Sequence, residues 1–563
     1  MTINTVASII SNELKKNKIK DIFMLTGYGA MYLNDAIQKA GIKYYAARNE
    51  ASAPMMAAAY AKQSNKIGAV CVTAGPGATN ALPGLAEAYV DSCPIIILSG
   101  QVERKHTSAK NKKINLRTYG TAEFNIIKNV KQMTKYAVTI NNPYSCLYEI
   151  QKAIHICKVG RPGPVWIEIP LDVQSFKIKK ISKLKKFINK SKNKKSLKKK
   201  DLKKVFNKII ISKKPLFIIG NGLKQSNSVN EFKKTFNKLK IPFFNSRFSN
   251  DLFSFKNKYN LGLCGIKGQL YSKSLLKKSD LIISLGCRLS PTLCHGDKKK
   301  LLSKKLLINI NNDTNEILLN SKLSNLYFNC DLKIFLKSFN KFIKNRKIKS
   351  FFEWSKHCQQ IKKDKIIKAI NEKNNPIDLY SFMYQVGEST VKKHTLITDA
   401  GSNYYAGGQV WFFKNKQNEI SSVTNAAMGL SVPLSIGAAV ANKKKQIISI
   451  TGDGSIELNI QELKTISHYN LNIKTFVINN GGYVSMQKWQ DDFFFGNRLD
   501  TEEKTGAGTL NFKNIAKAFD LKYLYIKSFN QINPTFKKVF SNNKPMLIEV
   551  FTDKNQKIYG KEI

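Results

Sequence analysis

The sequence predicts an α/β protein made of three units, each built on an open parallel β-sheet. Two observations carry this prediction. Short apolar runs that end in Gly or polar residues alternate with amphipathic stretches, which is the pattern of strand–helix–strand units. The length of 563 residues also exceeds what one hydrophobic core usually organises and suggests about three or four domains. Hydrophobic residues make up 42% of the chain, so wholesale disorder is excluded.

The first unit is predicted to occupy residues 1–174. An Ala-rich stretch at 51–62 is interpreted as a helix, and three apolar runs bounded by Gly or Pro are interpreted as buried strands. The strands are expected at residues 69–73, 94–98 and 165–169.

Two basic, polar stretches divide the chain, and residues 175–200 and 341–374 are predicted to be linkers. The stretch from Lys177 to Lys214 holds 18 Lys and a single acidic residue, Asp201. We expect a solvated segment that ends in the first helix of the next unit. An anion-binding arm is the functional alternative for this stretch.

The remaining two units are predicted at residues 201–340 and 375–563. Their strands end in Gly or polar residues, as strands do before the ligand-facing loops of open parallel sheets. The central unit is expected to contain strands at 215–220, 281–286 and 307–310, and the last unit strands at 395–399, 446–451, 474–479 and 546–551.

The chain carries 93 Lys and Arg against 38 Asp and Glu, which gives a formal net charge of +55. A charge of this size normally indicates nucleic acid or an anionic membrane as a partner. Only 8 of the basic residues are Arg, however, and proteins that read phosphates and bases favour Arg for its bidentate fork. We therefore interpret the lysine excess as compositional bias and expect no specific nucleic-acid partner.

Membrane association is not expected either. No uncharged apolar run reaches the roughly 18 residues that a transmembrane helix needs, and the first residues lack the pattern of a signal peptide. The nine cysteines are scattered singly, without a Cys-x-x-Cys pair, so a zinc ribbon or a disulfide framework is not expected. Buried thiols in a reducing compartment are the simpler interpretation, which predicts a cytoplasmic protein.

The strongest functional signal lies between residues 446 and 483. A buried strand runs into the sequence Thr-Gly-Asp-Gly-Ser, and a second strand ends in Asn-Asn, with a helical stretch between them. This is a βαβ unit, which places Asp453 and Asn480 at the same edge of a parallel sheet. The two side chains and the carbonyl of Gly482 are hard oxygen ligands that suit Mg²⁺. Gly452 and Gly454 would let the backbone approach a diphosphate, whereas two ordinary turns are the structural alternative.

This constellation resembles the signature of thiamine diphosphate enzymes, and it is most similar to the acetolactate synthase-like branch with its large catalytic subunit. The resemblance extends over nearly the whole chain. Segments that match the family pattern lie at residues 48–50, 73–80, 91–94, 99–102, 160–165, 286–288 and 427–430. The resemblance implies a pyrimidine-binding domain, a central domain and a diphosphate-binding domain, in this order, for the three predicted units.

Residue roles follow from the resemblance position by position. Glu50 matches the glutamate that activates the cofactor, and Gln101 matches a glutamine that carboligases place beside the bound intermediate, with a loop-capping amide as the alternative. Met428 matches the apolar residue that props the cofactor in a bent shape, and the carbonyl of Ala426 would receive its amino group. Further cofactor-binding positions are Thr73, Gly75, Asn80, Gly401, Ser402, Asn403, Gly452, Gly454, Ser455 and Tyr483.

The implied reaction is a thiamine diphosphate- and Mg²⁺-dependent decarboxylation of a 2-oxo acid, usually pyruvate, followed by carboligation of the acyl carbanion to a second carbonyl. Thr121 replaces a Phe of acetolactate synthases, and the segment 480–494 resembles carboligases of surface-polysaccharide pathways. A nucleotide-linked keto-sugar acceptor, or another lyase reaction of the superfamily, therefore stays open. A basic scaffold on an inactive enzyme fold would predict loss of Glu50, Asp453 or Asn480, and all three are present.

The resemblance also bears on assembly and on a second cofactor. Glu50 and Asp453 fall in different units, and the family forms its sites between subunits, so a homodimer or homotetramer is expected. The central domain of this branch often holds FAD. Candidate contacts lie at 220–222, 265–268, Arg288 and Asn311, but none is a specific fingerprint, and a domain without flavin is an equal alternative.

Overall fold

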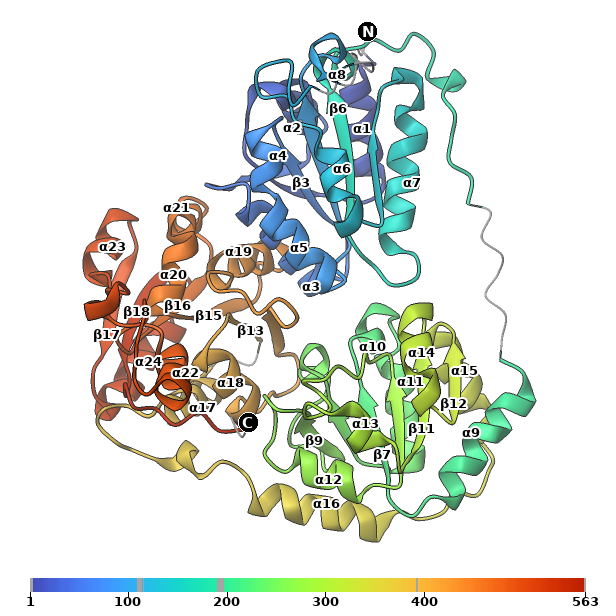
Figure 1. The fold of residues 1–563 in the computed structure, drawn as a ribbon, viewed down its shortest axis with the longest axis vertical. Coiled ribbons are helices and arrows are strands. Elements are labelled where there is room, and N and C mark those ends of the chain that lie inside the picture. Colours follow the sequence, from blue (N-terminus) through green and yellow to red (C-terminus); the bar gives the residue numbers. More distant parts are fainter. Residues whose placement is uncertain (1–3, 109–113, 115, 190–196, 391–392, 561–563) are drawn as a thin grey trace.

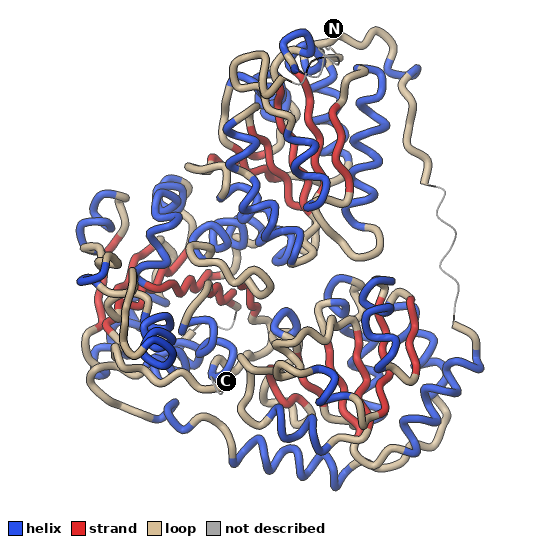
Figure 2. Tube along the Cα trace, in the orientation of Figure 1, coloured by secondary structure: helices blue, strands red, loops and turns tan. Residues whose placement is uncertain are grey.

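The computed structural model describes residues 4–108, 114, 116–189, 197–390 and 393–560. These residues form three units that follow one another along the chain, each with a six-stranded parallel sheet and helices around it (Figures 1 and 2). The predicted fold class, three open parallel-sheet units, is therefore confirmed. Fully buried strands such as Gly68–Val72 (GAVCV) and Leu281–Leu285 (LIISL) are almost entirely apolar, because helices cover both faces of a parallel sheet.

The N-terminal unit has the strand order β2-β1-β3-β4-β6-β5. Its strands are β1 (Asp21–Met24), β2 (Lys43–Ala46), β3 (Gly68–Val72), β4 (Ile95–Gln101), β5 (Tyr136–Thr139) and β6 (Val165–Pro170). Its helices are α1 (Val6–Lys16), α2 (Met31–Lys39), α3 (Ser52–Ser64), α4 (Pro76–Asn80), α5 (Leu82–Val90), α6 (Ile126–Val130), α7 (Cys146–Lys158) and α8 (Leu171–Gln174).

The central unit has the strand order β12-β11-β10-β7-β8-β9. Its strands are β7 (Pro215–Ile219), β8 (Phe243–Asn245), β9 (Asn260–Leu263), β10 (Leu281–Leu285), β11 (Leu306–Asn311) and β12 (Leu326–Asn329). Its helices are α9 (Lys199–Ile211), α10 (Gly222–Gln225), α11 (Val229–Leu239), α12 (Ser272–Lys278), α13 (Lys298–Leu302), α14 (Thr314–Asn320) and α15 (Leu332–Ile343).

The stretch 341–374 contains a helix of its own, α16 (Phe352–Asp364). Trp354 and Cys358 on this helix are buried in the apolar core of the central unit, and the indole of Trp354 donates a hydrogen bond to the carbonyl of Pro215 (2.9 Å). The sequence did not predict α16, because its few apolar residues are spaced among lysines and give only a weak helical pattern.

The C-terminal unit has the strand order β14-β13-β15-β16-β18-β17. Its strands are β13 (His394–Thr398), β14 (Asn418–Ser421), β15 (Gln446–Gly452), β16 (Ile473–Asn479), β17 (Lys522–Ile526) and β18 (Met546–Phe551). Its helices are α17 (Leu379–Ser389), α18 (Ser402–Val410), α19 (Ser431–Ala441), α20 (Asp453–Ile456), α21 (Leu463–His468), α22 (Val484–Phe494), α23 (Phe512–Ala518) and α24 (Ile532–Phe540), with a 3₁₀ segment at Glu457–Glu462 before α21.

The N-terminal and C-terminal units share one hydrophobic core. Helix α3 of the first lies against helix α19 of the second, and side chains from both helices belong to a single buried cluster (Figure 1). The contact is close at Gly437, where a Cβ atom would stand 1.9 Å from the carbonyl oxygen of Met56. Small residues on both helices therefore allow the backbones to approach, and they fix the two units relative to each other.

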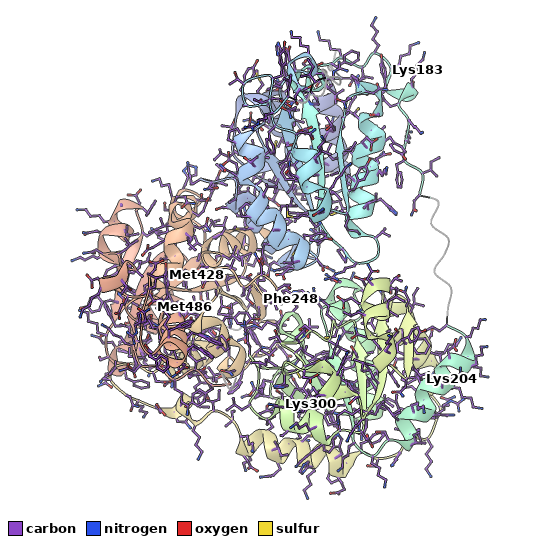
Figure 3. All side chains as sticks on the ribbon, in the orientation of Figure 1. Lys183, Lys204, Phe248, Lys300, Met428 and Met486 are labelled. Carbon is purple, nitrogen blue, oxygen red and sulfur yellow. The ribbon has the colours of Figure 1, made fainter. Side chains whose placement is uncertain are left out.

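None of the nine cysteines, all of which lie within the described residues, forms a disulfide, and eight of them are buried. Among the described residues, no helix combines the length and the apolar character that crossing a bilayer requires. Lysine side chains such as Lys183 and Lys204 extend from the periphery of the molecule (Figure 3).

Candidate active site

The two halves of the predicted site lie at the points where strand order reverses. In the C-terminal sheet the chain runs from β13 to β14 on one side and returns to β15 on the other, so a crevice opens between the carboxyl ends of β13 and β15. In the N-terminal sheet the same reversal occurs between β1 and β3. Residues 399–403 and 452–455 follow the first pair of strands, and residues 73–77 follow β3.

The carboxylate of Asp453 organises the turns after β15 and β16. These strands are paired with Gly452 opposite Ile478, so the turns that follow them are neighbours. One carboxylate oxygen of Asp453, Oδ2, accepts the backbone N–H groups of Asn480 (3.2 Å), Gly481 (2.9 Å) and Gly482 (2.9 Å). The structure thus brings together the three residues that the sequence predicts as metal ligands.

Asp453 is 1% exposed, and burial raises the pKa of its carboxyl above the ordinary value, while four backbone N–H groups oppose that shift. No basic side chain pairs with it among the described residues. A buried carboxylate without a cationic side chain is the environment in which a bound divalent cation gives its largest stabilisation. Asp453, Asn480 and the carbonyl of Gly482 could therefore hold Mg²⁺.

Glycines leave open space beside this carboxylate. A Cβ on Gly452 would meet nothing closer than 3.8 Å, and a Cβ on Gly401 would meet only the hydroxyl of Ser485 at 4.0 Å. Gly401 has a φ of +89° and directly precedes α18, whose first residues are Ser402 and Asn403. We call the open backbone at Gly401 and Gly452 the glycine cradle. The cradle and the start of α18 fit a diphosphate, because backbone N–H groups there are available to phosphate oxygens.

Asp399 stabilises the turn that follows β15. Its Oδ2 accepts hydrogen bonds from the hydroxyls of Ser455 (2.7 Å) and Thr451 (2.9 Å), and burial raises its pKa to about 6. The hydroxyl of Ser455 in turn accepts the N–H of Gly429 (2.9 Å). The turn after β15 and the loop that carries Ala426 and Met428 are therefore held by one network.

The loop at 426–429 is tightly bent, with positive φ at Ala426 (+53°) and Gly429 (+75°). Met428 is half-buried, and Met486 of α22 is exposed. Both lie in the C-terminal unit (Figure 3). Tyr483 lies directly on the turn, because a Cβ on Gly454 would stand 2.4 Å from its ring.

Glu50 lies in the N-terminal unit, between β2 and α3, and is 8% exposed. Its Oε2 accepts a hydrogen bond from the side chain of Asn80 (3.2 Å), and a Cβ on Gly77 would stand 3.3 Å from its Oε1. Gly75 has a φ of +55°, and a Cβ there would stand 2.4 Å from the carbonyl of Ala122. The predicted positions Glu50 and Asn80 are therefore in direct contact, with Glu50 buried and Asn80 exposed, whereas Gly75 lies against the backbone of Ala122.

Another predicted position in this unit is Thr73, whose hydroxyl accepts the N–H of Gly29 (3.0 Å). This bond joins the loops that follow β1 and β3 at the point of strand reversal. Thr73 thereby helps to shape the corner in which Glu50 lies.

Both the nitrogen and the oxygen of the Gln101 side-chain amide form hydrogen bonds within the chain. Its Nε2 donates to Glu168 Oε1 (3.0 Å) and to the carbonyl of Phe124 (2.8 Å), and its Oε1 accepts the N–H of Val102 (2.9 Å). These are the contacts that the loop-capping alternative predicts. Glu168 was missed by the motif search, although one charged residue inside the apolar strand β6 is a signal for a buried polar contact.

Glu168 gives a pH-dependent prediction. Burial raises its pKa to about 7, although hydrogen bonds from Thr139 and Gln101 act in the opposite direction. From about pH 4.5 to pH 7 the unfolded chain therefore loses a proton that the folded protein keeps, so this group lowers stability progressively as the pH rises. We expect Glu168→Gln to gain stability relative to the parent across this window, by up to about 3 kcal/mol above pH 7.

Urea unfolding of both proteins between about pH 4.5 and pH 8 measures this difference. Other titrating groups are common to both proteins and cancel in the comparison. A stability difference that stays constant over the whole range would contradict the assignment of a raised pKa to Glu168.

The central unit presents its own point of strand reversal, between β7 and β10. Arg288, a candidate flavin contact, is paired with Glu316 (3.3 Å), and Arg161 of the N-terminal unit is paired with Asp313 (3.1 Å) and Glu316 (3.3 Å). Both guanidinium groups are thus engaged by carboxylates of this chain. The side chain of Arg288 is nevertheless 46% exposed, so part of its guanidinium group faces solvent.

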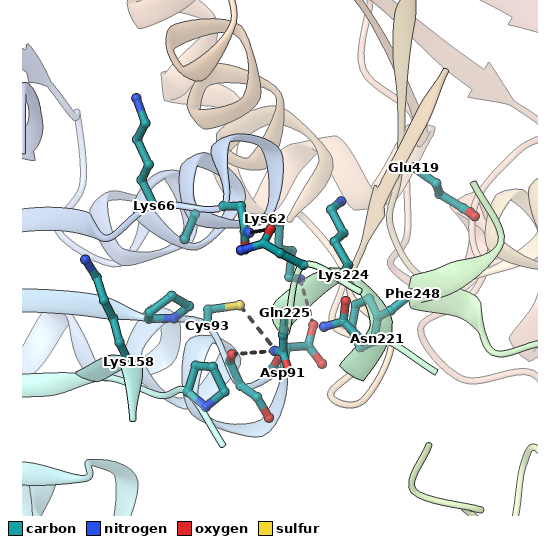
Figure 4. A pocket seen from close by; sticks show the side chains of 16 residues that line it. Lys62, Lys66, Asp91, Cys93, Lys158, Asn221, Lys224, Gln225, Phe248 and Glu419 are labelled. Atoms are coloured by element: carbon teal, nitrogen blue, oxygen red, sulfur yellow. Dashed lines mark hydrogen bonds and ion pairs between the residues drawn. The ribbon is translucent and has the colours of Figure 1, made fainter. Parts of the chain in front are cut away.

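A cavity of about 220 Å³ lies nearby, where the three units meet (Figure 4). Lys62 extends into it and pairs with Asp91 (2.8 Å), and both side chains are buried. Phe248 of the central unit lies below the Lys62 ammonium group, 5.0 Å from it. The cavity is therefore a basic junction between units, because Lys66, Lys158 and Lys224 line it in addition to the paired Lys62. Its volume is smaller than the roughly 300–1,000 Å³ of ordinary ligand pockets.

The parallel sheets and the open glycine backbone beside Asp453 fit a class of enzyme that binds a diphosphate cofactor on α/β units. Comparison with known families identifies the class. The thiamine pyrophosphate enzyme models match residues 4–128 (N-terminal TPP binding domain), 202–339 (central domain) and 399–550 (C-terminal TPP binding domain). The chain belongs to the thiamine pyrophosphate enzymes, pyrophosphate being another name for diphosphate, and the predicted family is confirmed.

Similar curated proteins narrow the likeness within that family. The acetolactate synthase large subunit of Lactococcus lactis is 27% identical over 98% of this chain and 93% of its own length. The corresponding subunit of Cyanidium caldarium is 28% identical over 99% and 94%, and acetolactate synthase 1 of Zea mays is 27% identical over 97% and 85%. This chain is therefore similar to acetolactate synthase large subunits over nearly its full length.

Proposed function

We propose that the protein is a thiamine diphosphate- and Mg²⁺-dependent carboligase that decarboxylates a 2-oxo acid, pyruvate above all, and joins the remaining fragment to a second carbonyl compound. The observation that carries this proposal is the buried Asp453 turn beside an open glycine cradle, in a chain that also holds a buried Glu50. The full-length similarity to acetolactate synthases supports the choice of reaction.

Within this proposal the C-terminal unit anchors the charged end of the cofactor. Asp453, Asn480 and the carbonyl of Gly482 would hold Mg²⁺, and the open backbone at Gly401 and Gly452 would face the diphosphate oxygens. Positions that would complete the binding surface are Thr73, Gly75, Asn80, Ser402, Asn403, Ala426, Met428, Gly454, Ser455 and Tyr483. When bound, the cofactor supplies the nucleophilic carbon that adds to the 2-oxo acid and takes up the electron pair released with CO₂.

Glu50 would hold a proton at the ring nitrogen N1′ of the pyrimidine. Its buried position favours this role, because a carboxylate in a poorly solvated corner shares a proton strongly with a ring nitrogen. Asn80 would orient the carboxylate through the hydrogen bond to Oε2. Gln101, whose amide is bound to Glu168 and Phe124, would first have to exchange one of those partners before it could reach a substrate.

We further propose that the active form is a homodimer or a homotetramer of such dimers in the cytoplasm, with the Glu50 corner of one subunit completing the Asp453 cradle of another. The two groups belong to different units of the chain, and an isologous pair would create two equal sites. The domain boundaries that we propose are 1–174, 201–340 and 375–563, joined by the stretches 175–200 and 341–374, and the second stretch packs its helix α16 onto the central unit. For the central unit we keep both interpretations, a domain that holds FAD and a domain without flavin.

The keto-sugar acceptor is disfavoured by the comparisons, since acetolactate synthases match 97–99% of this chain. The test is direct. Purified protein with Mg²⁺ and thiamine diphosphate receives pyruvate alone, pyruvate with 2-oxobutyrate, or pyruvate with a nucleotide-linked keto-sugar, and the products are identified by mass spectrometry. We expect acetolactate from the first reaction, whereas an adduct formed only with the sugar would overturn the proposal.

A further inference from the structure

The segment that follows the Asp453 turn reaches across to the N-terminal unit and holds the backbone just before Glu50. Glu462, at the end of the 3₁₀ segment, has no exposed surface. Its Oε1 accepts the backbone N–H groups of Arg48 (2.9 Å) and Asn49 (3.2 Å). Glu462 therefore grips the two residues that immediately precede Glu50 in the sequence.

The second oxygen of Glu462 is fixed as well. Its Oε2 accepts the hydroxyl of Thr465 (2.8 Å), and the same hydroxyl lies 3.2 Å from the carbonyl of Ala46. The N–H of Ala46 donates to the hydroxyl of Tyr469 (2.9 Å). The end of β2 is thus bound to the segment 462–469 through three side chains of the C-terminal unit.

A further contact lies on the other side of Glu50. The hydroxyl of Ser52, at the start of α3, donates to Asn459 Oδ1 (3.0 Å). The Nδ2 of Asn459 donates to the carbonyl of Gly429 (2.9 Å), in the loop that carries Ala426 and Met428. Glu50 is therefore bracketed, before and after, by hydrogen bonds to one short segment.

Burying the Glu462 carboxylate costs more free energy than a purely structural contact requires. Burial raises the pKa of its carboxyl, and the N–H groups of Arg48 and Asn49 and the Thr465 hydroxyl act against that shift. A neutral amide oxygen could accept the same two N–H groups without a buried ionisable group, whereas a carboxylate accepts them in shorter, stronger bonds. The result is a rigid backbone at a position where rigidity matters for a reacting side chain.

We propose that Glu462 is a positioning residue that sets Glu50 in register with the cofactor. This inference rests on the proposed function, in which Glu50 acts at the pyrimidine nitrogen. A displacement of about 1 Å at a reacting group can cost on the order of 10²-fold in rate, so the loss of two backbone hydrogen bonds next to Glu50 is sufficient for a large effect. Glu462 itself touches neither substrate nor cofactor.

The test uses full-length Glu462→Ala and Glu462→Gln, with Asp520→Ala as the matched control. Asp520 pairs with Lys464 (2.9 Å) on the exposed side of α21, so its removal deletes a carboxylate near the same helix without touching the Glu50 segment. Three quantities are measured: the dissociation constant of thiamine diphosphate with Mg²⁺, the melting temperature, and the rate of hydrogen–deuterium exchange at C2 of the bound cofactor.

For Glu462→Ala we expect the C2 exchange rate to fall by about 10- to 100-fold, while the dissociation constant changes by less than about threefold. Glu462→Gln should recover most of the rate, because its carbonyl oxygen can accept the same N–H groups. Asp520→Ala should match the parent. Should the alanine variant not fold, Glu462→Asp is the substitute, since its shorter side chain reaches the Arg48–Asn49 backbone poorly.

An unchanged exchange rate in a folded variant, or a rate that falls only in step with cofactor affinity, would overturn the positioning role. A parallel measurement on Glu50→Gln separates this outcome from failure of the proposed function. If Glu50→Gln keeps the parental exchange rate, the assignment of Glu50 is wrong. If Glu50→Gln loses exchange but Glu462→Ala keeps it, only the role of Glu462 is refuted.

Discussion

Replacing Glu50 by glutamine is expected to remove most of the turnover while the cofactor still binds. Glutamine has nearly the same size and can keep a contact with Asn80, which lies 3.2 Å from the carboxylate. It cannot share a proton with the pyrimidine nitrogen, however, and general acid–base contributions of this kind are worth roughly 10²- to 10⁴-fold. Steady-state rates at saturating cofactor, together with a binding titration, measure the two effects separately.

Glu103→Gln is the matched control for this experiment. Glu103 belongs to the same unit, is partly exposed and pairs with Lys105 (2.7 Å), so its replacement should leave turnover unchanged. Full activity of Glu50→Gln with saturating cofactor would refute the proposed activation.

The second large effect is expected from Asp453→Ala, which should abolish Mg²⁺-dependent binding of thiamine diphosphate. The substitution removes the proposed anionic metal ligand, and it also removes the acceptor of the N–H groups of Asn480, Gly481 and Gly482. Each buried N–H group left without a partner costs about 1–3 kcal/mol, so the melting temperature should fall as well.

Asp453→Asn separates these two consequences. Its side-chain oxygen can still accept backbone N–H groups, so the turn should persist, whereas the charge that attracts the metal is gone. Isothermal titration with Mg²⁺ and the cofactor should show a strongly weakened affinity for both variants and a parental affinity for Asp520→Asn. An unchanged affinity in Asp453→Asn would show that the metal is held elsewhere.

The sequence predicted those parts of the fold and site whose signal is local. Apolar runs ending in Gly located most central strands to within a residue or two, and the 27-residue spacing of Asp453 and Asn480 placed both at one sheet edge. The same argument predicted Gly452 as a cofactor-binding position, because a strand-to-helix turn next to a diphosphate needs open backbone.

The parts that the sequence did not predict depend on contacts between distant segments. Glu462 lies 414 positions from Arg48, and nothing in the local sequence around either residue indicates that they meet. Gln101 was recognised by its neighbours, but its partner Glu168 lies 67 positions away. Such pairs are set by how whole units pack, which periodicity and motif spacing do not encode.

The common core of α3 and α19 has a consequence for how the chain comes apart. Because one buried cluster contains side chains of both the N-terminal and the C-terminal unit, neither unit can expose its half of the cluster while the other remains intact. The central unit has separate apolar clusters, and it meets its neighbours through ionic contacts such as Arg161 with Asp313 and through the stacked rings of Phe255 and Phe412. We therefore expect the three sheets to unfold as two cooperative blocks, and the block that spans the chain ends is the one that carries both halves of the proposed active site.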